Sequence, residues 1–227
     1  MSFSKLGLAP EIVRAVTEFG YTEPTAIQEQ AIPAILAGGD ILAGAQTGSG
    51  KTAAFTLPIL HMLADKSVKG QSEGRPPIRA LILVPTRELA AQVEECIIDY
   101  GKHLKLTSMV MIGGVSINPQ IKALRSRVDI LVATPGRLLD HISQGTLSLS
   151  QVQTLILDEA DRMLDMGFIR DIKKILALLP KKRQTLLFSA TFSPEIKTLA
   201  AQFLNDPVLI QASAPNTTVA LITHKVH

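Results

Sequence analysis

Seven short runs rich in Ile, Leu and Val are the feature that most limits what this 227-residue chain can fold into. Each run is apolar throughout instead of alternating with polar residues. Such strands are typical of a parallel sheet that helices cover on both faces. The runs span residues 40–45, 80–85, 107–112, 129–134, 154–158, 185–188 and 208–210. The sequence therefore predicts an α/β fold, a single doubly wound domain with a mostly parallel sheet.

Helical periodicity precedes and separates these runs. Two helices are expected before residue 38, and Pro33 is expected to break or kink the second because proline lacks a backbone N–H. The single cysteine, Cys96, falls on the apolar face of a later predicted helix, which indicates a buried thiol and excludes an internal disulfide. Residues 65–79 are polar and rich in Gly and Pro, and a mobile surface loop is expected there.

Composition narrows the function classes only slightly. The net charge of +3 is compatible with a polyanionic partner but does not by itself indicate one. The five histidines show no ligand-like spacing, so no structural metal is expected. No apolar run approaches the ~20 residues that span a bilayer, and the N-terminus lacks the apolar core of a signal peptide. We therefore expect a cytoplasmic, monomeric protein with no membrane contact.

The first apolar run leads into a glycine-spaced turn and then a predicted helix, which is the layout of a phosphate cradle. Lys51 can reach the β and γ phosphates, and the Thr52 hydroxyl can ligate Mg²⁺. Ala45 stands where the usual pattern has its first glycine, and a chance turn before a helix is the alternative. The predicted nucleotide-binding residues of this cradle are Ala45, Gln46, Thr47, Gly48, Ser49, Gly50, Lys51 and Thr52.

An acidic pair, Asp158-Glu159, follows the run that ends at Leu157. Ligands bind beyond the carboxyl ends of parallel strands, so this pair is expected beside the cradle. Asp158 is then placed to hold Mg²⁺, largely through water, and Glu159 to orient and deprotonate an attacking water. The predicted catalytic residues are Glu159, Lys51 and Asp158. An acidic turn that merely caps the next helix is the alternative.

Three more strand-to-helix junctions have the chemistry of phosphate contacts. Thr134 can cap the helix that Pro135 begins, which leaves free N–H groups at its start. Aromatic residues make up only 4% of the chain and Trp is absent, which favours contact with a nucleic-acid backbone over base stacking. Three ordinary turns are the alternative. The residues concerned are Pro85, Thr86, Arg87, Gly113, Gly114, Thr134, Pro135, Gly136 and Arg137.

Taken in order, these motifs and Asp158-Glu159-Ala160-Asp161 resemble the first RecA-like domain of a DEAD-box RNA helicase. Residues 162–168 are most similar to the bacterial RhlE-like subgroup. The resemblance implies ATP and Mg²⁺ as cofactors and RNA as the bound nucleic acid. It also implies that Gln28 reads adenine, that Phe3 and Tyr21 pack around the base, and that Asp161 bonds toward the strand-end residues. These strand-end residues are Ser189 and Thr191.

The resemblance also implies a domain plan. Residues 1–38 are expected to form a helical segment with the Q motif, 39–211 the RecA-like ATP-binding domain, and 212–227 a linker toward an absent second RecA-like domain. Because that domain carries arginines that complete the ATP site, this chain is expected to be an N-terminal fragment, nearly inactive alone. Two other classes stay open: a module that binds ATP without turnover, and a P-loop kinase acting on a small molecule.

Overall fold

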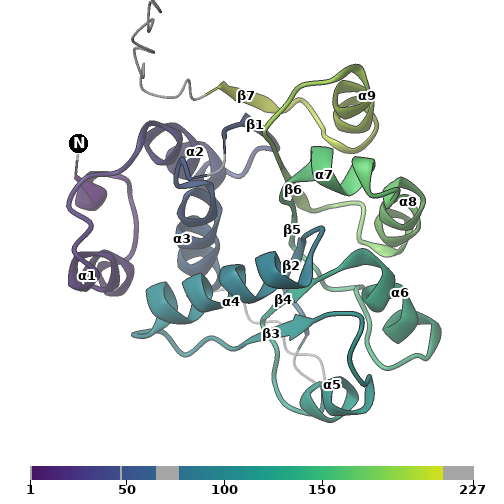
Figure 1. Cartoon of the computed structure of the whole chain (residues 1–227). Coiled ribbons are helices and arrows are strands. Elements are labelled where there is room, and N and C mark those ends of the chain that lie inside the picture. Colours follow the sequence, from purple (N-terminus) through teal and green to yellow (C-terminus); the bar gives the residue numbers. More distant parts are fainter. Residues whose placement is uncertain (1, 47, 65–76, 212–227) are drawn as a thin grey trace, which may run out of the picture.

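The computed structural model describes residues 2–46, 48–64 and 77–211, which form a seven-stranded sheet with helices on both faces (Figure 1). All neighbouring strands are parallel, and their order is β3-β4-β2-β5-β6-β1-β7. The predicted strands are all present, with ends close to those expected, so the fold prediction is confirmed. The strands are β1 (Ile41–Gly44), β2 (Ala80–Leu83), β3 (Ser108–Met111), β4 (Ile130–Ala133), β5 (Thr154–Leu157), β6 (Gln184–Ser189) and β7 (Val208–Gln211).

The helices divide between the two faces of the sheet. In Figure 1, α1 to α4 lie on one side of the strands and α6 to α9 on the other, with α5 beyond β3. The predicted linker at 212–227 and most of the predicted loop at 65–79 lie outside the described residues. The helices are η1 (Phe3–Lys5), α1 (Pro10–Glu18), α2 (Ala26–Leu36), α3 (Lys51–Ala64), α4 (Arg87–Gly101), α5 (Asn118–Ala123), α6 (Pro135–Ser143), α7 (Ala160–Asp165), α8 (Ile169–Leu178) and α9 (Pro194–Phe203).

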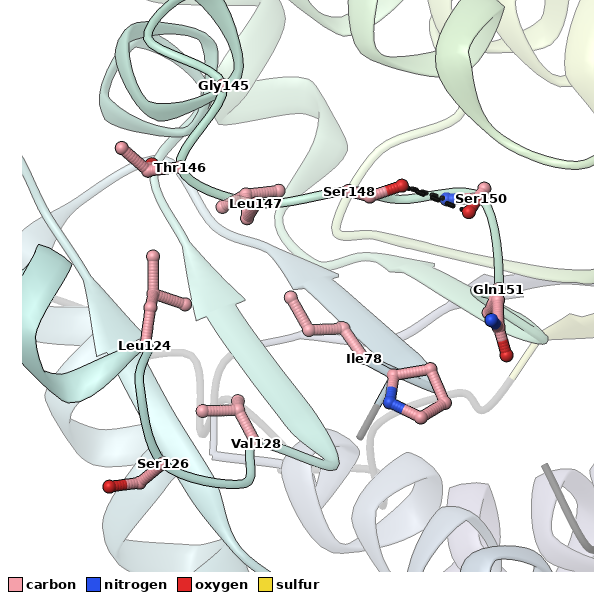
Figure 2. A pocket seen from close by; sticks show the side chains of 11 residues that line it. Ile78, Leu124, Ser126, Val128, Gly145, Thr146, Leu147, Ser148, Ser150 and Gln151 are labelled. Carbon is pink, nitrogen blue, oxygen red and sulfur yellow. Dashed lines mark hydrogen bonds between the residues drawn. The ribbon is translucent and has the colours of Figure 1, made fainter. Parts of the chain in front are cut away.

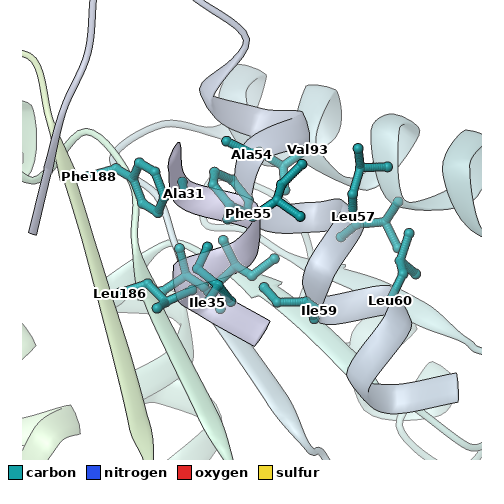
Figure 3. Close-up of a cluster of buried hydrophobic side chains, with 14 of the residues drawn as sticks. Ala31, Ile35, Ala54, Phe55, Leu57, Ile59, Leu60, Val93, Leu186 and Phe188 are labelled. Atoms are coloured by element: carbon teal, nitrogen blue, oxygen red, sulfur yellow. The ribbon is translucent and has the colours of Figure 1, made fainter. Parts of the chain in front are cut away.

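The sheet separates two hydrophobic cores. Alternate side chains of a strand point to opposite faces, so Phe188 of β6 enters the core under α2 and α3 while Leu187 enters the core under α7 to α9. Phe55 of α3 packs on Phe188 with ring centroids 5.2 Å apart (Figure 3). Since α3 has neighbours on most sides, it is apolar almost all round, as expected of a buried helix.

The N-terminal helices are part of the first core. Ile12 of α1 and Ile27 and Ile32 of α2 are almost fully buried among residues of α3 and the sheet. Residues 1–38 are thus joined to the sheet domain by a continuous core. This packing fixes the N-terminal end of α2, and with it Gln28, against the turn that follows β1.

The structure corrects two local predictions. Of the expected break or kink at Pro33, the break is wrong, because α2 runs on to Leu36. Pro33 lies in the last turn, where its missing N–H costs the helix one bond, and its carbonyl still accepts from the Ala37 N–H at 3.0 Å. The Cys96 side chain is partly exposed, because α4 buries the face formed by Ala90, Val93 and Ile97. Partial burial still raises the pKa of Cys96, with nearby Asp99 and Glu95 adding to the effect.

Candidate functional site

Except for the N-terminal residues Phe3, Tyr21 and Gln28, the predicted motifs lie at or directly after the ends of strands at one side of the sheet. The register pairs Gly44 with Ser189, and Leu83 with both Ala133 and Leu157. We call this side of the sheet the carboxyl edge. The cradle, the acidic pair and the Ser189 to Thr191 turn follow β1, β5 and β6, which are neighbours. The three other junctions follow β2, β3 and β4, which form the adjoining half of the same edge.

The cradle is a compact turn between β1 and α3. The Ala45 N–H donates to the Ser189 carbonyl at 3.1 Å, which ties the start of the turn to β6. The Ser49 hydroxyl donates to the Gln46 carbonyl at 2.7 Å. Gly48 and Gly50 have φ angles of 81° and 91°, in the left-handed region that favours glycine. Thr47 lies outside the described residues.

Lys51 is the first residue of α3 and its side chain points into the protein. It is only 7% exposed, yet its Nζ has no hydrogen-bond partner among the described residues. A buried ammonium without a partner is costly, and the charge of Asp158 compensates it electrostatically. The position at a helix N-terminus, beside the turn, suits an anionic ligand that would complete this pairing.

The acidic pair lies at the end of β5. Asp158 is 2% exposed, and its carboxylate accepts a hydrogen bond from the Glu159 N–H at 2.9 Å. Burial raises the pKa of Asp158 to about 6; Lys51 opposes this shift, while Glu159 and Asp161 add to it. Such a carboxylate gains from a cation that restores its charge balance.

Glu159 itself is held in an unusual backbone conformation. Its φ and ψ angles are 52° and 51°, in the left-handed region that non-glycine residues seldom adopt. Its Oε2 accepts from Nη1 of Arg162, one turn later on α7, at 3.2 Å. The acidic side chain is thus aimed by backbone strain and held by one ion pair. Sequence reasoning missed Arg162, although its spacing of three residues from Glu159 on a helix would have indicated the contact.

The residues at this edge fit a magnesium ion better than a metal bound by protein side chains alone. Among the described residues, no group of three or more His, Cys, Asp or Glu side chains could hold a metal. Mg²⁺ is typically held by one or two carboxylates, with phosphate oxygens and water filling the other positions. The buried Asp158 carboxylate has too little positive charge around it to balance its own. Together with the hydroxyl of Thr52 at the start of α3, it forms such a donor set.

Asp161 connects the acidic motif to the end of β6. Its Oδ2 accepts from the Ala190 N–H at 3.1 Å and from both the N–H and the hydroxyl of Thr191, at 3.1 and 3.2 Å. Ser189 bonds to Thr191 instead, through a weak 3.4 Å contact from the Thr191 N–H to its Oγ. The structure therefore brings the three predicted coupling residues together, with Thr191 between Ser189 and Asp161.

A cavity of about 270 Å³ lies between the N-terminal segment and the cradle, lined by Phe3, Tyr21 and Gln28 among others. Gln28 Oε1 accepts from the Thr25 N–H at 3.0 Å, and its Nε2 donates to the Gly50 carbonyl at 3.1 Å. A Cβ at Gly50 would lie 2.5 Å from this Nε2, so only glycine allows the approach. One lone pair and one N–H of the amide are left over, which is the pair that adenine requires.

The three remaining junctions contact one another. The Thr86 hydroxyl caps α4 by accepting from the Leu89 N–H at 3.2 Å. The exposed Arg87 lies against Gly114, where a Cβ would be 2.4 Å from its Nη1. Arg137 donates through Nη2 to the Val115 carbonyl at 2.8 Å. The two arginines therefore hold the loop after β3 between them.

The other predicted residues of these junctions have simpler surroundings. Pro135 is at the first position of α6 and Thr134 at its N-cap, but the Thr134 side chain makes no capping bond. Pro85, directly before Thr86, is buried. A Cβ at Gly113 or Gly136 would meet nothing within 4 Å, so packing inside the described chain does not require glycine there.

A second cavity, of about 300 Å³, lies at the opposite edge, where β2, β4 and β5 begin (Figure 2). Ile78, Leu124 and Val128 point toward it, and none of its lining residues is charged. It receives none of the motif residues. We therefore assign the candidate site to the carboxyl edge alone.

Comparison with known proteins decides what this arrangement of motifs means. The family model of DEAD/DEAH box helicases matches residues 25–199. The chain belongs to this family. The ATP-dependent RNA helicase CshA of Limosilactobacillus reuteri is 47% identical over 222 residues, which cover 98% of this chain and 43% of that protein. The ATP-dependent RNA helicase DeaD of Escherichia coli is 46% identical over 218 residues, covering 96% and 33%.

A solved structure supports the RecA-like assignment of the fold. A DEAD box protein from the hyperthermophile Methanococcus jannaschii matches with a TM-score of 0.84 and 43% identity, covering 94% of this chain and 56% of that one. The chain spans less than half the length of the curated relatives named above. No helix in the described parts of the chain is long and apolar enough to cross a membrane. Placement in the RhlE-like subgroup stays a prediction.

Proposed function

We propose that this chain is the first RecA-like domain of an ATP-dependent RNA helicase, which binds ATP with Mg²⁺ and the backbone of single-stranded RNA. One observation carries the proposal: the carboxyl edge leaves Lys51 and Asp158 buried and incompletely paired beside the strained Glu159. A triphosphate with its magnesium ion would complete both charges. The names of the relatives and the family membership support the same reading.

In this proposal the protein's own groups divide the chemistry among them. The cradle N–H groups and Lys51 bind the phosphates. At the other end of the nucleotide, selectivity for adenine comes from Gln28, Phe3 and Tyr21. Asp158 and Thr52 would hold Mg²⁺, which when bound offsets charge on the β and γ phosphates. Glu159 orients a water and accepts its proton as the water oxygen attacks the γ phosphorus and the bond to ADP breaks. Arg162 positions the Glu159 carboxylate through their ion pair.

The adjoining half of the edge is proposed to bind RNA. Arg87 and Arg137 would meet phosphates, together with free N–H groups at the starts of α4 and α6. Contacts of this kind are independent of sequence and weaken as salt rises. Asp161 and Thr191 join the acidic motif to β6, and we propose that this contact links the nucleotide state to the grip on RNA.

We propose that residues 1–38 and 39–211 act together as the nucleotide-binding unit, and that 212–227 leads to a second RecA-like domain. Arginines of that domain would complete the ATP site, a contribution of about 10³ to 10⁵ in rate where such residues have been studied. Short RNA duplexes would be unwound only by the two domains together. We also expect a monomer in the cytoplasm, which sedimentation and cell fractionation would test.

An ATPase assay of the purified chain, with and without single-stranded RNA, tests this proposal. We expect the chain alone to bind ADP and to show no RNA-stimulated turnover. Joining it to the second domain should restore turnover far better than mixing the two, because the linker raises the effective concentration. Robust RNA-dependent turnover by the chain alone would contradict the two-domain mechanism.

The same assay separates the two other classes of function. A module that uses ATP only as a switch would bind nucleotide and RNA in the two-domain protein but would not release phosphate in response to RNA. A small-molecule kinase would transfer phosphate to an acceptor, which appears as a phosphorylated product instead of free phosphate. RNA-stimulated release of free phosphate supports neither.

A further inference from the structure

One wall of the adenine cavity comes from outside the predicted nucleotide motifs. Tyr100, in the last turn of α4, lines this cavity together with Phe3 and Tyr21. In the sequence Tyr100 appears only as an apolar position of a helix. In the structure the ring packs partly on the first core, so its position is fixed by α4 and not by the loop around Tyr21.

Tyr21 needs such support. It lies in the connection between α1 and α2, and 54% of its surface is exposed. Burial raises the pKa of Tyr100 to about 12, with charges nearby and a hydrogen-bonding contact with Tyr21 among the further causes. The Tyr100 hydroxyl therefore stays protonated, and Tyr100 and Tyr21 line the wall of the same cavity.

A set of contacts between α1 and α4 holds both ends of this arrangement, and we call it the α1–α4 clamp. Phe19 packs edge-to-face on Tyr100, with ring centroids 6.2 Å apart and an interplanar angle of 86°. The Lys102 ammonium lies 4.7 Å from the centroid of the Phe19 ring and 2.5 Å from Glu18 Oε2. The clamp comprises Glu18, Phe19, Tyr100, Lys102 and His103.

The charged part of the clamp is centred on Glu18. This carboxylate also accepts from Arg14 Nε at 2.8 Å and lies 3.1 Å from Nε2 of His103. Hydrogen bonds from Lys102, Arg14 and His103 lower the pKa of Glu18 to about 2. Glu18 is therefore ionised at neutral pH, and the chain leaves α1 toward Tyr21 directly beyond this anchored point.

From this geometry we infer that Tyr100 is a positioning residue for base selectivity: supported by the α1–α4 clamp, it holds Tyr21 where an adenine ring would pack. The inference rests on the proposed binding of adenine nucleotides. Tyr100 would act through Tyr21. Its loss should therefore weaken the binding of adenine nucleotides more than that of guanine nucleotides, and leave the phosphate contacts of Lys51 unchanged. A purely structural role would weaken all nucleotides alike.

Titration of ADP and GDP against the chain and its Tyr100 variants tests this inference. For Tyr100→Ala we expect ADP to bind about 3- to 10-fold more weakly, the range for loss of an aromatic contact, with GDP changed by less than about 2-fold. Tyr100→Phe keeps the packing on Phe19 and should give a smaller loss.

The clamp has its own matched pair of variants. Lys102→Met removes the charge that joins Glu18 to Phe19 and should reduce the preference for ADP, whereas Lys105→Met, at an exposed site just beyond, should not. Thermal denaturation checks that each variant is folded. If Tyr100→Ala leaves the ratio of ADP affinity to GDP affinity unchanged, the inference is overturned while the proposed function stands. A wild-type chain without preference for ADP would overturn the proposed function with it.

Discussion

Two aspartates, one at each edge of the sheet, are both almost fully shielded from solvent, yet their pKa values shift in opposite directions. Asp129 lies where β4 begins and Asp158 where β5 ends, and each is 2% exposed. Asp129 accepts hydrogen bonds from Arg79, Arg127 and the Thr107 N–H, at 2.8 to 3.0 Å. Burial raises its pKa, but these partners outweigh burial and the net pKa is lowered. Asp158 accepts one backbone bond, and its pKa is raised to about 6.

The difference shows which edge the chain completes for itself. At the amino edge the protein supplies partners to Asp129 on both carboxylate oxygens, so this charge cluster stabilises the fold. At the carboxyl edge the described residues leave Lys51 without a hydrogen bond and Glu159 with a strained backbone. Incomplete groups cost stability, and they persist where a ligand recovers that cost on binding. The contrast therefore assigns structure to one edge and function to the other.

The largest expected effect is on turnover at the carboxyl edge. Glu159→Gln in the full-length protein should lower kcat by about 10²- to 10⁴-fold, because it removes the proposed general base. ATP affinity should change little, since Glu159 is proposed to act on water. Single-turnover hydrolysis and nucleotide titration measure the two quantities. A loss of ATP affinity as large as the loss of rate would assign Glu159 to binding.

Glu11→Gln is the matched control for this substitution. Glu11 is an exposed residue of α1, so the same change of atoms there should leave both turnover and affinity near wild type. A comparable loss of rate in the control would show that the assay reports a general property of the chain instead of the acidic pair.

The second prediction compares the two aspartates as folding residues. Asp129→Asn should lower the free energy of unfolding by about 3 to 5 kcal/mol, because it leaves the buried Arg79 without its counter-charge. Asp158→Asn should be neutral or stabilising, since it removes a carboxylate with too few partners. Chemical denaturation of both variants without nucleotide gives the comparison. Similar destabilisation by the two changes would remove the distinction between the edges.

The third prediction concerns pH. The folded pKa of Asp158, about 6, lies above its ordinary value of 3.8. The stability that this group contributes is therefore present below pH about 4 and is lost as pH rises through 6. Relative to Asp158→Asn, the metal-free wild type should lose on the order of 2 to 3 kcal/mol between pH 4 and 7. Asp129 has the opposite sign, and its contribution should be lost only below pH 3.8.

Denaturation curves in EDTA at several pH values would measure this dependence. A flat difference between wild type and Asp158→Asn across this range would mean that Asp158 has a partner that keeps its pKa ordinary.

Most of the fold follows from local sequence. Continuous apolar runs such as 80–85 indicate strands buried on both faces, and residues directly after such strands must gather at one edge. This is why the cradle, the acidic pair and the three other junctions are expected together. The failures are local: whether Pro33 ends a helix depends on its place in the last turn, and the exposure of Cys96 depends on which face of α4 meets the sheet.

The parts that sequence does not predict depend on contacts between distant segments. The meeting of Tyr100 and Tyr21 in one cavity wall and the position of Lys102 over Phe19 bring together residues about 80 positions apart, so no local pattern records them. The difference between Asp129 and Asp158 is likewise invisible in sequence, because both follow or precede similar apolar runs. Their partners decide the charge balance, and those partners come from other elements.

The smallest expected effect concerns Gln28, which belongs to the carboxyl edge. Unlike Lys51, Gln28 already has two hydrogen-bond partners within the protein. Gln28→Ala should reduce the preference for ATP over GTP by about 1 to 3 kcal/mol if the amide reads the N6 and N7 edge of adenine. Gln28→Glu is the matched variant: it can still accept from the Thr25 N–H but cannot donate to the Gly50 carbonyl or to N7. Titration of both nucleotides against the three proteins separates the roles. If Gln28→Glu keeps the preference that Gln28→Ala loses, an acceptor oxygen at this position is sufficient for selectivity; if both lose it, the amide N–H donor is required as well.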